Sequence, residues 1–174
     1  MLRGAHVTLV NASVSVEPPM FVDVVNVTSA ADMADVVKSK AAEQDIIIMT
    51  AAVADFCPSH PADEKIKKND SSYESVIELE RTEDILSYLG AHKAKGQLIC
   101  GFSMETQNML ENSKAKLAKK NADMIVANNL KVAGAGFGTD TNVVTLITAD
   151  DCTELEIMDK SCVAARIMDR LLQM

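Results

Sequence analysis

This chain has no tryptophan, no long apolar run and no paired cysteine motif. Aromatic residues make up 3% of its 174 residues, so we expect a core of aliphatic side chains and methionine. No stretch approaches the roughly 20 apolar residues that span a bilayer, and no signal-peptide pattern is present. Cys57, Cys100, Cys152 and Cys162 lack the C-x-x-C spacing of zinc and redox motifs. We therefore predict a soluble, cytoplasmic protein with free thiols and no contact with a membrane.

The composition is typical of a globular domain. Hydrophobic residues make up 48% of the chain and charged residues 24%, and the length suits one domain over residues 1–174. The net charge of −8 argues against binding of nucleic acid, which requires clustered lysine and arginine. A small anionic ligand is compatible with this charge, because a local group of lysines attracts it.

Hydrophobic patterning predicts strands that alternate with helices. Short apolar or alternating runs predict strands at residues 5–10, 22–27, 45–50, 76–79, 98–102, 124–127 and 143–147. Other segments predict helices at residues 30–43, 84–89, 108–121 and 161–172. The alternation indicates an α/β fold with a three-layer, Rossmann-like parallel sheet. We expect residues 45–50 to be buried on both faces, residues 143–147 to form an edge strand, and residues 76–79 to form a small β-hairpin or lid extension with residues near 65–67.

A glycine-rich G-x-G-x-x-G turn, which usually follows the first strand of a Rossmann-type sheet, is also absent. The segment Met1–Gly4 instead looks like the end of a helix, with Gly4 as its terminator. Either the topology differs from that of a Rossmann-type sheet or the chain lacks its first strand–loop–helix unit. We favour the second explanation and expect a single domain that is incomplete at its N-terminus.

Small residues and an aspartate follow the predicted strand at 45–50. In open α/β sheets, ligands bind beyond the carboxyl ends of the strands. Ala51, Ala52 and Ala54 leave room for backbone groups to approach a ligand, and Asp55 suits a ribose hydroxyl or a metal ion. An ordinary strand–loop junction with a solvated aspartate explains the same pattern.

Lysines are grouped at two places in this acidic chain. Lys65, Lys67 and Lys68 form one group, and Lys116 and Lys120 lie one turn apart on one face of a predicted helix. Rotatable ammonium groups suit the oxygens of a polyphosphate. Solvated surface lysines are the alternative explanation for both groups.

Two further segments are weaker candidates. Phe102 ends the predicted strand at 98–102, where an exposed ring would stack on a nucleobase, although filling of the core is the default explanation. The glycine-rich segment Gly134–Gly138 has the composition of a phosphate-binding nest, but such loops are common before a strand.

Five motifs, taken in order, resemble those of bacterial phosphopantothenoylcysteine synthetases, the phosphopantothenate–cysteine ligases. The motifs are AAVADFCPSHPADEKIKK at residues 51–68, RTEDIL at 81–86, GFSMET at 101–106, KLAKKNADMIVANN at 116–129 and GFGTDTNVVTLI at 136–147. They cover nearly the whole chain, and the resemblance extends to the C-terminal domain of a bifunctional flavoprotein of coenzyme A biosynthesis.

The resemblance implies a reaction and its participants. CTP activates 4'-phosphopantothenate to an acyl-cytidylate with release of pyrophosphate, and the amine of cysteine then displaces CMP. Magnesium assists, the family forms homodimers, and an FMN-dependent decarboxylase is often fused to the domain. No FMN is expected in the ligase domain itself.

The resemblance also implies site residues. Lys65 is expected to be catalytic, since it would neutralise charge as the carboxylate attacks the α-phosphorus. The residues expected to bind the cytidine nucleotide are Met49, Thr50, Ala51, Asp55, Lys65, Glu83, Asp84, Ile85, Leu86, Phe102, Lys116 and Lys120. The metal ligands are not predicted.

The chain departs from the family pattern at three places. Glu83 replaces the usual proline, and Asn11-Ala12 replaces a frequent Gly-Pro. The family's N-x-S-S-G-K-M-G segment, which holds the triphosphate, is absent, so we expect this chain alone to shape much of the cytidine site but to catalyse poorly or not at all. The alternatives are a non-catalytic CTP-binding or regulatory fragment of the same fold, and a related α/β nucleotide- or flavin-binding module.

Overall fold

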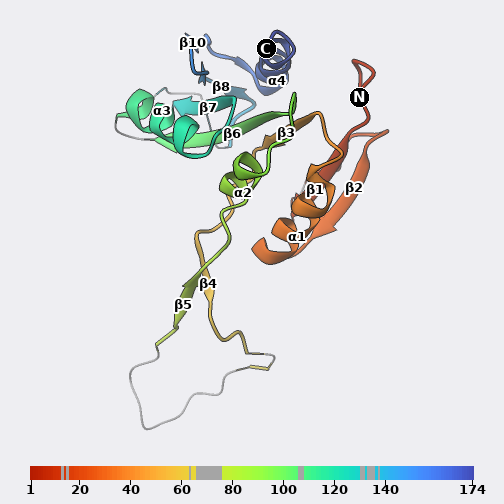
Figure 1. Cartoon of the computed structure of the whole chain (residues 1–174), viewed down its shortest axis with the longest axis vertical. Coiled ribbons are helices and arrows are strands. Elements are labelled where there is room, and N and C mark those ends of the chain that lie inside the picture. The colour runs from red at the N-terminus through yellow and green to blue at the C-terminus, as the bar shows by residue number, and fades with distance from the viewer. Residues whose placement is uncertain are drawn as a thin grey trace. The chain divides into compact units, whose positions relative to one another are not determined.

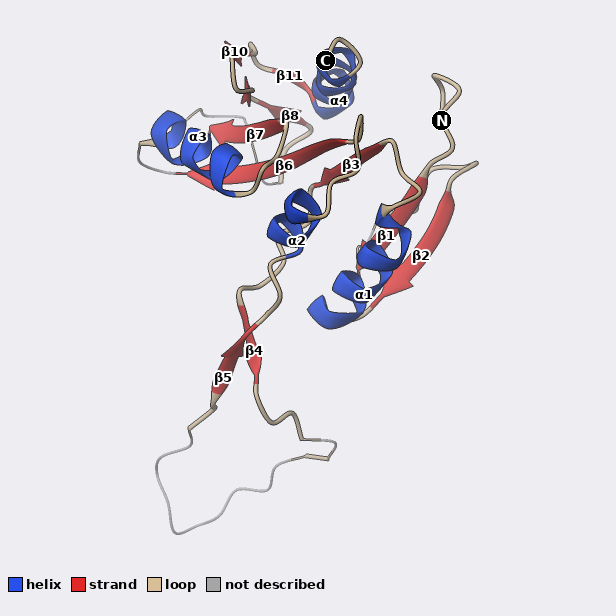
Figure 2. Ribbon diagram, viewed as in Figure 1, coloured by secondary structure: helices blue, strands red, loops and turns tan. Residues whose placement is uncertain are grey.

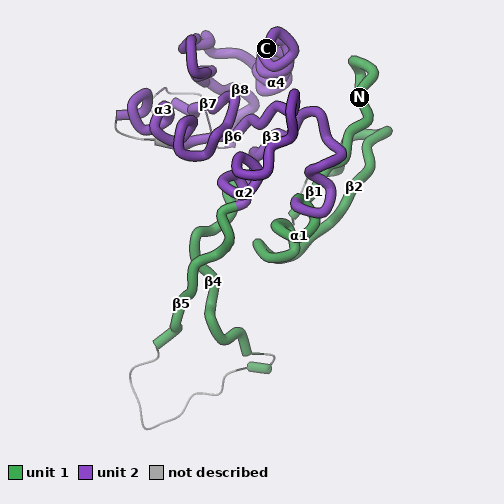
Figure 3. The backbone as a smooth tube through the Cα atoms, in the orientation of Figure 1, with its two compact units in different colours: residues 1–37, 52–84 green, residues 38–51, 85–174 purple. Residues whose placement is uncertain are grey.

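The structure is a computed structural model that describes residues 1–12, 14, 16–62, 64–65, 76–105, 108–129, 132, 136 and 138–174. The chain divides into two compact units (Figure 3). The first unit comprises residues 1–37 and 52–84, and the second comprises residues 38–51 and 85–174. Within the described ranges, no helix combines the length and apolar content that crossing a bilayer requires.

The first unit contains a parallel pair of strands and the start of a helix (Figure 1). β1 (Thr8–Ala12) pairs in parallel with β2 (Asp23–Val27), and α1 (Ala30–Ala41) follows. Apolar side chains of β2 and α1 form the buried part of this unit, namely Val27, Met33, Ala34 and Val37. These elements confirm the first two predicted strands and the first predicted helix. The segment Met1–Gly4 is a turn rather than a helix end, closed by the Gly4 N–H on the Met1 carbonyl at 2.9 Å.

A capping box formed by Ser29 and Asp32 begins α1. The Asp32 backbone N–H donates to Ser29 Oγ at 3.1 Å, and the Ser29 N–H donates to the Asp32 carboxylate at 2.9 Å. The Thr28 hydroxyl donates to the same carboxylate at 2.8 Å. The hydrogen bonds with Ser29, and then those with Thr28, lower the pKa of Asp32 from 3.8 to about 2.

A short hairpin completes the first unit. β4 (Phe56–Pro58) pairs antiparallel with β5 (Leu79–Arg81), so that Phe56 lies opposite Arg81. The predicted hairpin is present, but its predicted partner near residues 65–67 is wrong. Lys65 is not in a strand, and residues 66–67 lie outside the described residues. The sequence did not predict β4 as a strand, because Pro58 lacks the N–H that the interior of a strand requires.

The second unit contains a five-stranded mixed sheet in the order β10-β9-β7-β6-β3. Figure 2 draws its strands in red and labels β3, β6, β7 and β10. Its strands are β3 (Ile46–Met49), β6 (Leu98–Glu105), β7 (Met124–Asn129), β9 (Val144–Ile147) and β10 (Cys152–Glu154). β3, β6 and β7 are parallel, whereas β9 and β10 are antiparallel to their neighbours.

Two predictions about this sheet are wrong. β9 was expected at the edge, but it lies between β7 and β10, and all four of its residues are buried. β3 was expected to be buried on both faces, but it is the end strand of this sheet, and Ile48 is 36% exposed. A continuous apolar run therefore did not distinguish a central strand from an end strand.

Three helices cover the two faces of this sheet. They are α2 (Ile85–Ala91), α3 (Met109–Lys119) and α4 (Lys160–Leu171). α4 packs on one face through buried side chains, which together form the core cluster Cys100, Met124, Val126, Val144, Leu146, Val163, Ile167 and Leu171. α2 and α3 contact the alternate residues of β6, which point to the opposite face. The predicted three-layer α/β architecture is thus confirmed in this unit.

Short polar connections complete the second unit. β8 (Thr141–Asn142) pairs antiparallel with β11 (Met158–Asp159) next to the start of α4. Asp123, directly before β7, accepts hydrogen bonds from the Ile99 N–H at 2.7 Å and the Lys93 ammonium at 2.8 Å. This carboxylate therefore holds the first half of β6 against β7.

Candidate functional site

The carboxyl end of β3 meets β6 at a glycine. Met49, the last residue of β3, pairs with Gly101, and the Leu86 side chain of α2 lies over the same position. A Cβ atom added to Gly101 would lie 2.7 Å from Leu86 Cδ2, so the glycine permits this close approach. Thr50 and Ala51 follow β3 as exposed residues. Four predicted site residues therefore gather around the end of one parallel strand.

The α3 lysines differ in their surroundings. Lys114 and Lys119 are exposed, whereas Lys116 and Lys120 are half-buried. The Lys116 ammonium donates to the Phe102 carbonyl at 2.8 Å, which joins α3 to β6. The Phe102 side chain is half-buried and packs against the core cluster under α4. The Phe102 ring therefore fills the core, which is the default explanation given by the sequence, and Phe102 presents its backbone to this site.

The α2 helix contributes a second set of contacts to the same region. The Lys120 ammonium donates to Ser87 Oγ at 2.9 Å, and Asn121 donates to the Gly90 carbonyl at 2.7 Å. Ile85 is 4% exposed and anchors the first turn of α2 in the core. The two lysines thus reach from α3 to β6 and to α2, on the face of the sheet that these helices share.

Four other predicted residues belong to the first unit, where the base of the β4–β5 hairpin brings some of them together. The Thr82 N–H donates to the Asp55 carbonyl at 3.0 Å, and the Thr82 hydroxyl donates to the Ala54 carbonyl. Asp55 therefore lies opposite the residue that precedes Glu83 and Asp84. All three carboxylate residues are exposed. The exposed carboxylate of Asp55 is able to accept a hydrogen bond from a hydroxyl group.

The structure describes only part of two predicted loop sites, the lysine group at residues 65–68 and the glycine-rich segment at residues 134–138. Lys65 is exposed, and the rest of its lysine group lies outside the described residues. In the glycine-rich segment, Gly136 and Gly138 have φ values of 105° and 70°, and the other three residues lie outside the described part of the chain. Neither prediction is tested by these residues.

Metal binding has little support among the residues that the structure describes. In those residues, no group of three or more His, Cys, Asp or Glu side chains is placed to hold a metal ion. All four cysteines are free thiols. Burial, and then the negative charge of Asp123, raises the pKa of Cys100 to about 12, so this thiol is held in its neutral form.

Sequence reasoning missed the polar partners of the predicted residues. Ser87 receives Lys120, and a buried pair, Ser103 and Ser113, joins β6 to α3 with a distance of 2.8 Å between the hydroxyl oxygens. Thr82 stands inside the RTEDIL motif, and the site residues that this motif predicts all follow it. Ser113 precedes Lys116 by three residues, and Lys116 precedes Lys120 by four, so the helical repeat places Ser113 on the same face as the two lysines.

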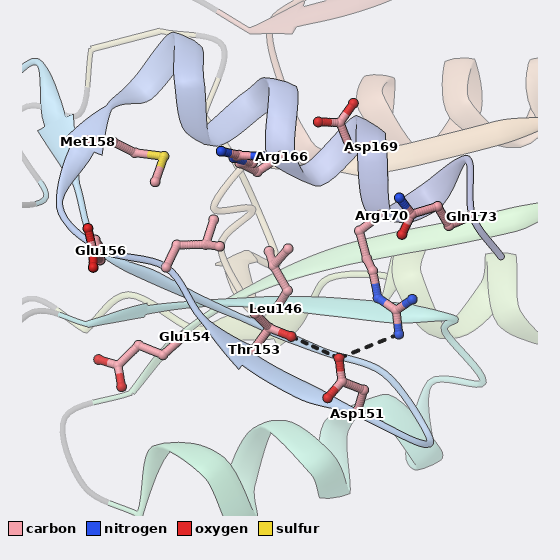
Figure 4. A pocket seen from close by; sticks show the side chains of 11 residues that line it. Leu146, Asp151, Thr153, Glu154, Glu156, Met158, Arg166, Asp169, Arg170 and Gln173 are labelled. Carbon is pink, nitrogen blue, oxygen red and sulfur yellow. Dashed lines mark hydrogen bonds and ion pairs between the residues drawn. The ribbon is translucent and has the colours of Figure 1, made fainter.

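A groove lies elsewhere in the second unit, between β10 and α4 (Figure 4). It has a volume of about 520 Å³. Arg170 crosses it to reach the Asp151 carboxylate at 3.6 Å, and Thr153 donates to the same carboxylate at 2.8 Å. None of the residues predicted to bind the nucleotide lines this groove.

The geometry defines a class of protein: a three-layer α/β domain with lysines and backbone groups gathered beside the end of a parallel strand, where such folds bind ligands. Comparison with known proteins identifies the family. The chain belongs to the family of DNA/pantothenate metabolism flavoprotein C-terminal domains, which matches residues 1–174. This confirms the resemblance inferred from the five sequence motifs.

Individual relatives agree with this assignment. The chain is 45% identical over 170 residues to the coenzyme A biosynthesis bifunctional protein CoaBC of Bacillus subtilis (strain 168), covering 97% of this chain and 41% of that protein. It is 44% identical over 171 residues to a cysteine/cysteine sulfinic acid decarboxylase of an unknown prokaryotic organism, covering 97% and 47% respectively. The chain thus spans less than half the length of these relatives.

A solved structure supports the fold. The crystal structure of the C-terminal domain of a coenzyme A biosynthesis bifunctional protein CoaBC matches 99% of this chain and 77% of that chain. The two share 40% sequence identity and a TM-score of 0.80. The fold described above is therefore that of the CoaBC C-terminal domain.

Proposed function

We propose that this domain carries out the ligation of 4'-phosphopantothenate with cysteine, driven by CTP. The substrate carboxylate attacks the α-phosphorus of CTP and releases pyrophosphate, and the cysteine amine then displaces CMP from the acyl-cytidylate. The observation that carries the proposal is the gathering of Met49, Leu86, Phe102, Lys116 and Lys120 in the second unit of a chain of this family.

The contacts of these residues indicate which of them would bind the phosphates and which would bind the cytidine. Lys116 donates one of its three N–H groups to the Phe102 carbonyl, so two remain for phosphate oxygens, and Lys120 donates to Ser87 on α2. Backbone groups of Thr50, Ala51 and Phe102 would hold the cytidine. Asp55 would accept a hydrogen bond from a ribose hydroxyl.

Lys65 is the proposed catalytic residue. As an exposed, flexible cation, it suits a group that approaches the triphosphate and neutralises the charge that develops at the α-phosphorus. Magnesium would enter with the triphosphate, because it prefers phosphate oxygens, water and one or two carboxylates to a cage of protein ligands. When bound, it would reduce the negative charge of the leaving pyrophosphate.

The proposed setting of the enzyme follows from its relatives. The Bacillus relative is named a bifunctional protein, which supports fusion of such a domain to a second activity, proposed here to be an FMN-dependent decarboxylase. We further propose a cytoplasmic homodimer, and that the ligase domain itself binds no FMN.

Calorimetric titration with CTP tests the proposal. We expect saturable binding of CTP and weaker binding by the Lys116→Met variant, whereas Lys114→Met, an exposed control on the same helix, should bind as the original chain does. Failure of the original chain to bind CTP would contradict the proposed nucleotide site.

A second assay separates an enzyme from a binding fragment. Pyrophosphate release in the presence of phosphopantothenate, cysteine, CTP and magnesium is measured for the chain joined to the part of the Bacillus subtilis relative that it does not match. Turnover that is lost in Lys65→Gln while CTP still binds supports catalysis. CTP binding without turnover in the joined protein supports the alternative, a non-catalytic regulatory fragment.

A further inference from the structure

The inward face of α3 carries one hydroxyl contact and two ammonium contacts where aliphatic packing would be ordinary. Ser113, Lys116, Leu117 and Lys120 occupy this face with the spacing of successive helical turns. Leu117 is 7% exposed and fills the space under the helix. The other three residues each hold a polar partner on β6 or α2. The polar contacts therefore determine where α3 sits on its neighbours.

Ser113 and Ser103 form the most buried of these contacts. Ser113 is 0% exposed and Ser103 is 4% exposed, and their hydroxyl oxygens lie 2.8 Å apart. Each hydroxyl loses its water on burial, so the pair is stable only while the two meet. Two aliphatic side chains would pack here without any such requirement. The pair thus favours one position of α3 over others that are slightly shifted.

The serine pair lies directly beside the lysine contact. Ser103 follows Phe102 in β6, and Ser113 lies one turn before Lys116 in α3. Two hydrogen bonds therefore join α3 to β6 side by side, one between the two serines and one from Lys116 to Phe102. A shift of α3 by one residue would turn its face by about 100° and break both bonds.

The strand side of the pair is itself held in place. Asn128 of β7 donates to the Ser103 carbonyl at 3.4 Å, and Asn142 donates to Asn128 Oδ1 at 2.8 Å. The Val143 N–H donates to Asn142 Oδ1 at 2.9 Å. A chain of polar groups thus runs from β8 through β7 and β6 to Ser113, and the shift of one member is resisted by the rest.

We propose that Ser113 is a positioning residue whose bond to Ser103 sets the place of α3 on β6 and thereby aims the Lys116 ammonium at the phosphates of the nucleotide. The inference rests on the proposed nucleotide site. The Phe102 carbonyl takes one N–H of Lys116 and leaves two for the ligand, so the direction of these two follows the position of the helix. Ser113 touches no ligand and acts only through Lys116.

A double-mutant cycle tests this dependence, with the affinity for CTP as the readout. Ser113→Ala should weaken CTP binding about fivefold or more in the original chain, in the range measured for coupled neighbours, and less than twofold in a Lys116→Met background. Ser161→Ala, an exposed serine at the start of α4, is the control and should change nothing. Equal factors in the two backgrounds would overturn the proposal.

The variant Ser103→Ala/Ser113→Ala separates position from stability. Removal of both hydroxyls leaves no unpaired buried group, so the thermal midpoint should recover relative to Ser113→Ala alone. CTP binding should stay weak, because the bond that positions α3 is still absent. Recovery of both properties together would show that Ser113 has only a structural role and would contradict the proposal.

A third measurement does not depend on the nucleotide. Reductive methylation of the folded protein, read by mass spectrometry, should modify Lys116 more slowly than the exposed Lys114. In Ser113→Ala the two rates should approach each other. An unchanged slow rate at Lys116 would overturn the positioning role. Absence of CTP binding by the original chain would instead count against the proposed function, and the methylation rates would still decide the role of Ser113.

Discussion

A Gly90→Ala substitution tests the close contact between α2 and the end of α3. A Cβ atom at this position would lie 1.8 Å from the Lys120 carbonyl oxygen and 2.8 Å from its carbon. Contacts below 3.0 Å are essentially never seen, so α2 has to retreat by about 1.2 Å in a Gly90→Ala variant. This retreat strains the bond from Asn121 to the Gly90 carbonyl and the bond from Lys120 to Ser87.

The expected magnitude follows from these contacts. Overpacking costs about 1–3 kcal/mol, and each weakened hydrogen bond adds about 1 kcal/mol. Helix propensity acts in the opposite direction, because alanine in a helix is about 0.5–1 kcal/mol more favourable than glycine. We therefore expect Gly90→Ala to lower the free energy of unfolding by about 3 kcal/mol, and the Tm by about 6–12 °C for a domain of this size.

Thermal unfolding followed by circular dichroism measures this effect. Gly96→Ala is the matched control, because a Cβ there meets open space and the only cost comes from its φ of 84°. That cost is about 1–2 kcal/mol. If Gly90→Ala unfolds at or above the Tm of the original chain, propensity alone governs the site and the close approach of α2 to α3 is refuted.

Three further predictions concern charge and reactivity. Asp123→Ala should lower the free energy of unfolding by about 2–3 kcal/mol in chemical denaturation, because a buried strand N–H and Lys93 lose their acceptor. Asp32 should titrate by NMR near pH 2. Since folding lowers its pKa from 3.8, its contribution to stability is complete above about pH 4 and is lost as the pH falls through 2, and Asp32→Asn should abolish this dependence. Cys100 should react with a thiol reagent only on unfolding, whereas the exposed Cys152 should react in the native protein.

The sequence predicted the positions of helices and strands along the chain better than it predicted which strands lie next to each other in the sheet. Periodicity located α4 and the parallel strands to within a few residues, because burial of one face imposes that periodicity wherever the element lies. The place of β9 between β7 and β10 was not predicted, since an antiparallel strand in the middle of a sheet has the same apolar composition as one at its edge. β4 was missed because three residues that include a proline resemble a loop.

In the candidate site, too, the sequence predicted local relations but not contacts between distant segments. The lysine spacing on α3 predicted correctly that Lys116 and Lys120 share a face, because this relation is local. Their partners on β6 and α2 are distant in sequence, and no local pattern identifies the carbonyl of Phe102 or the hydroxyl of Ser87 as an acceptor. The orientation of the Phe102 ring was likewise decided by packing under α4.

The order of the strands has a consequence for synthesis of the protein on the ribosome. β3, β6 and β7 emerge before β9 and α4, yet the core cluster takes side chains from all of the last four of these elements. Until β9 and α4 follow, one apolar face of β6 and β7 has no cover. A nascent chain paused within β7 therefore exposes an apolar, aggregation-prone surface that a chaperone would recognise. In the folded domain this surface is buried.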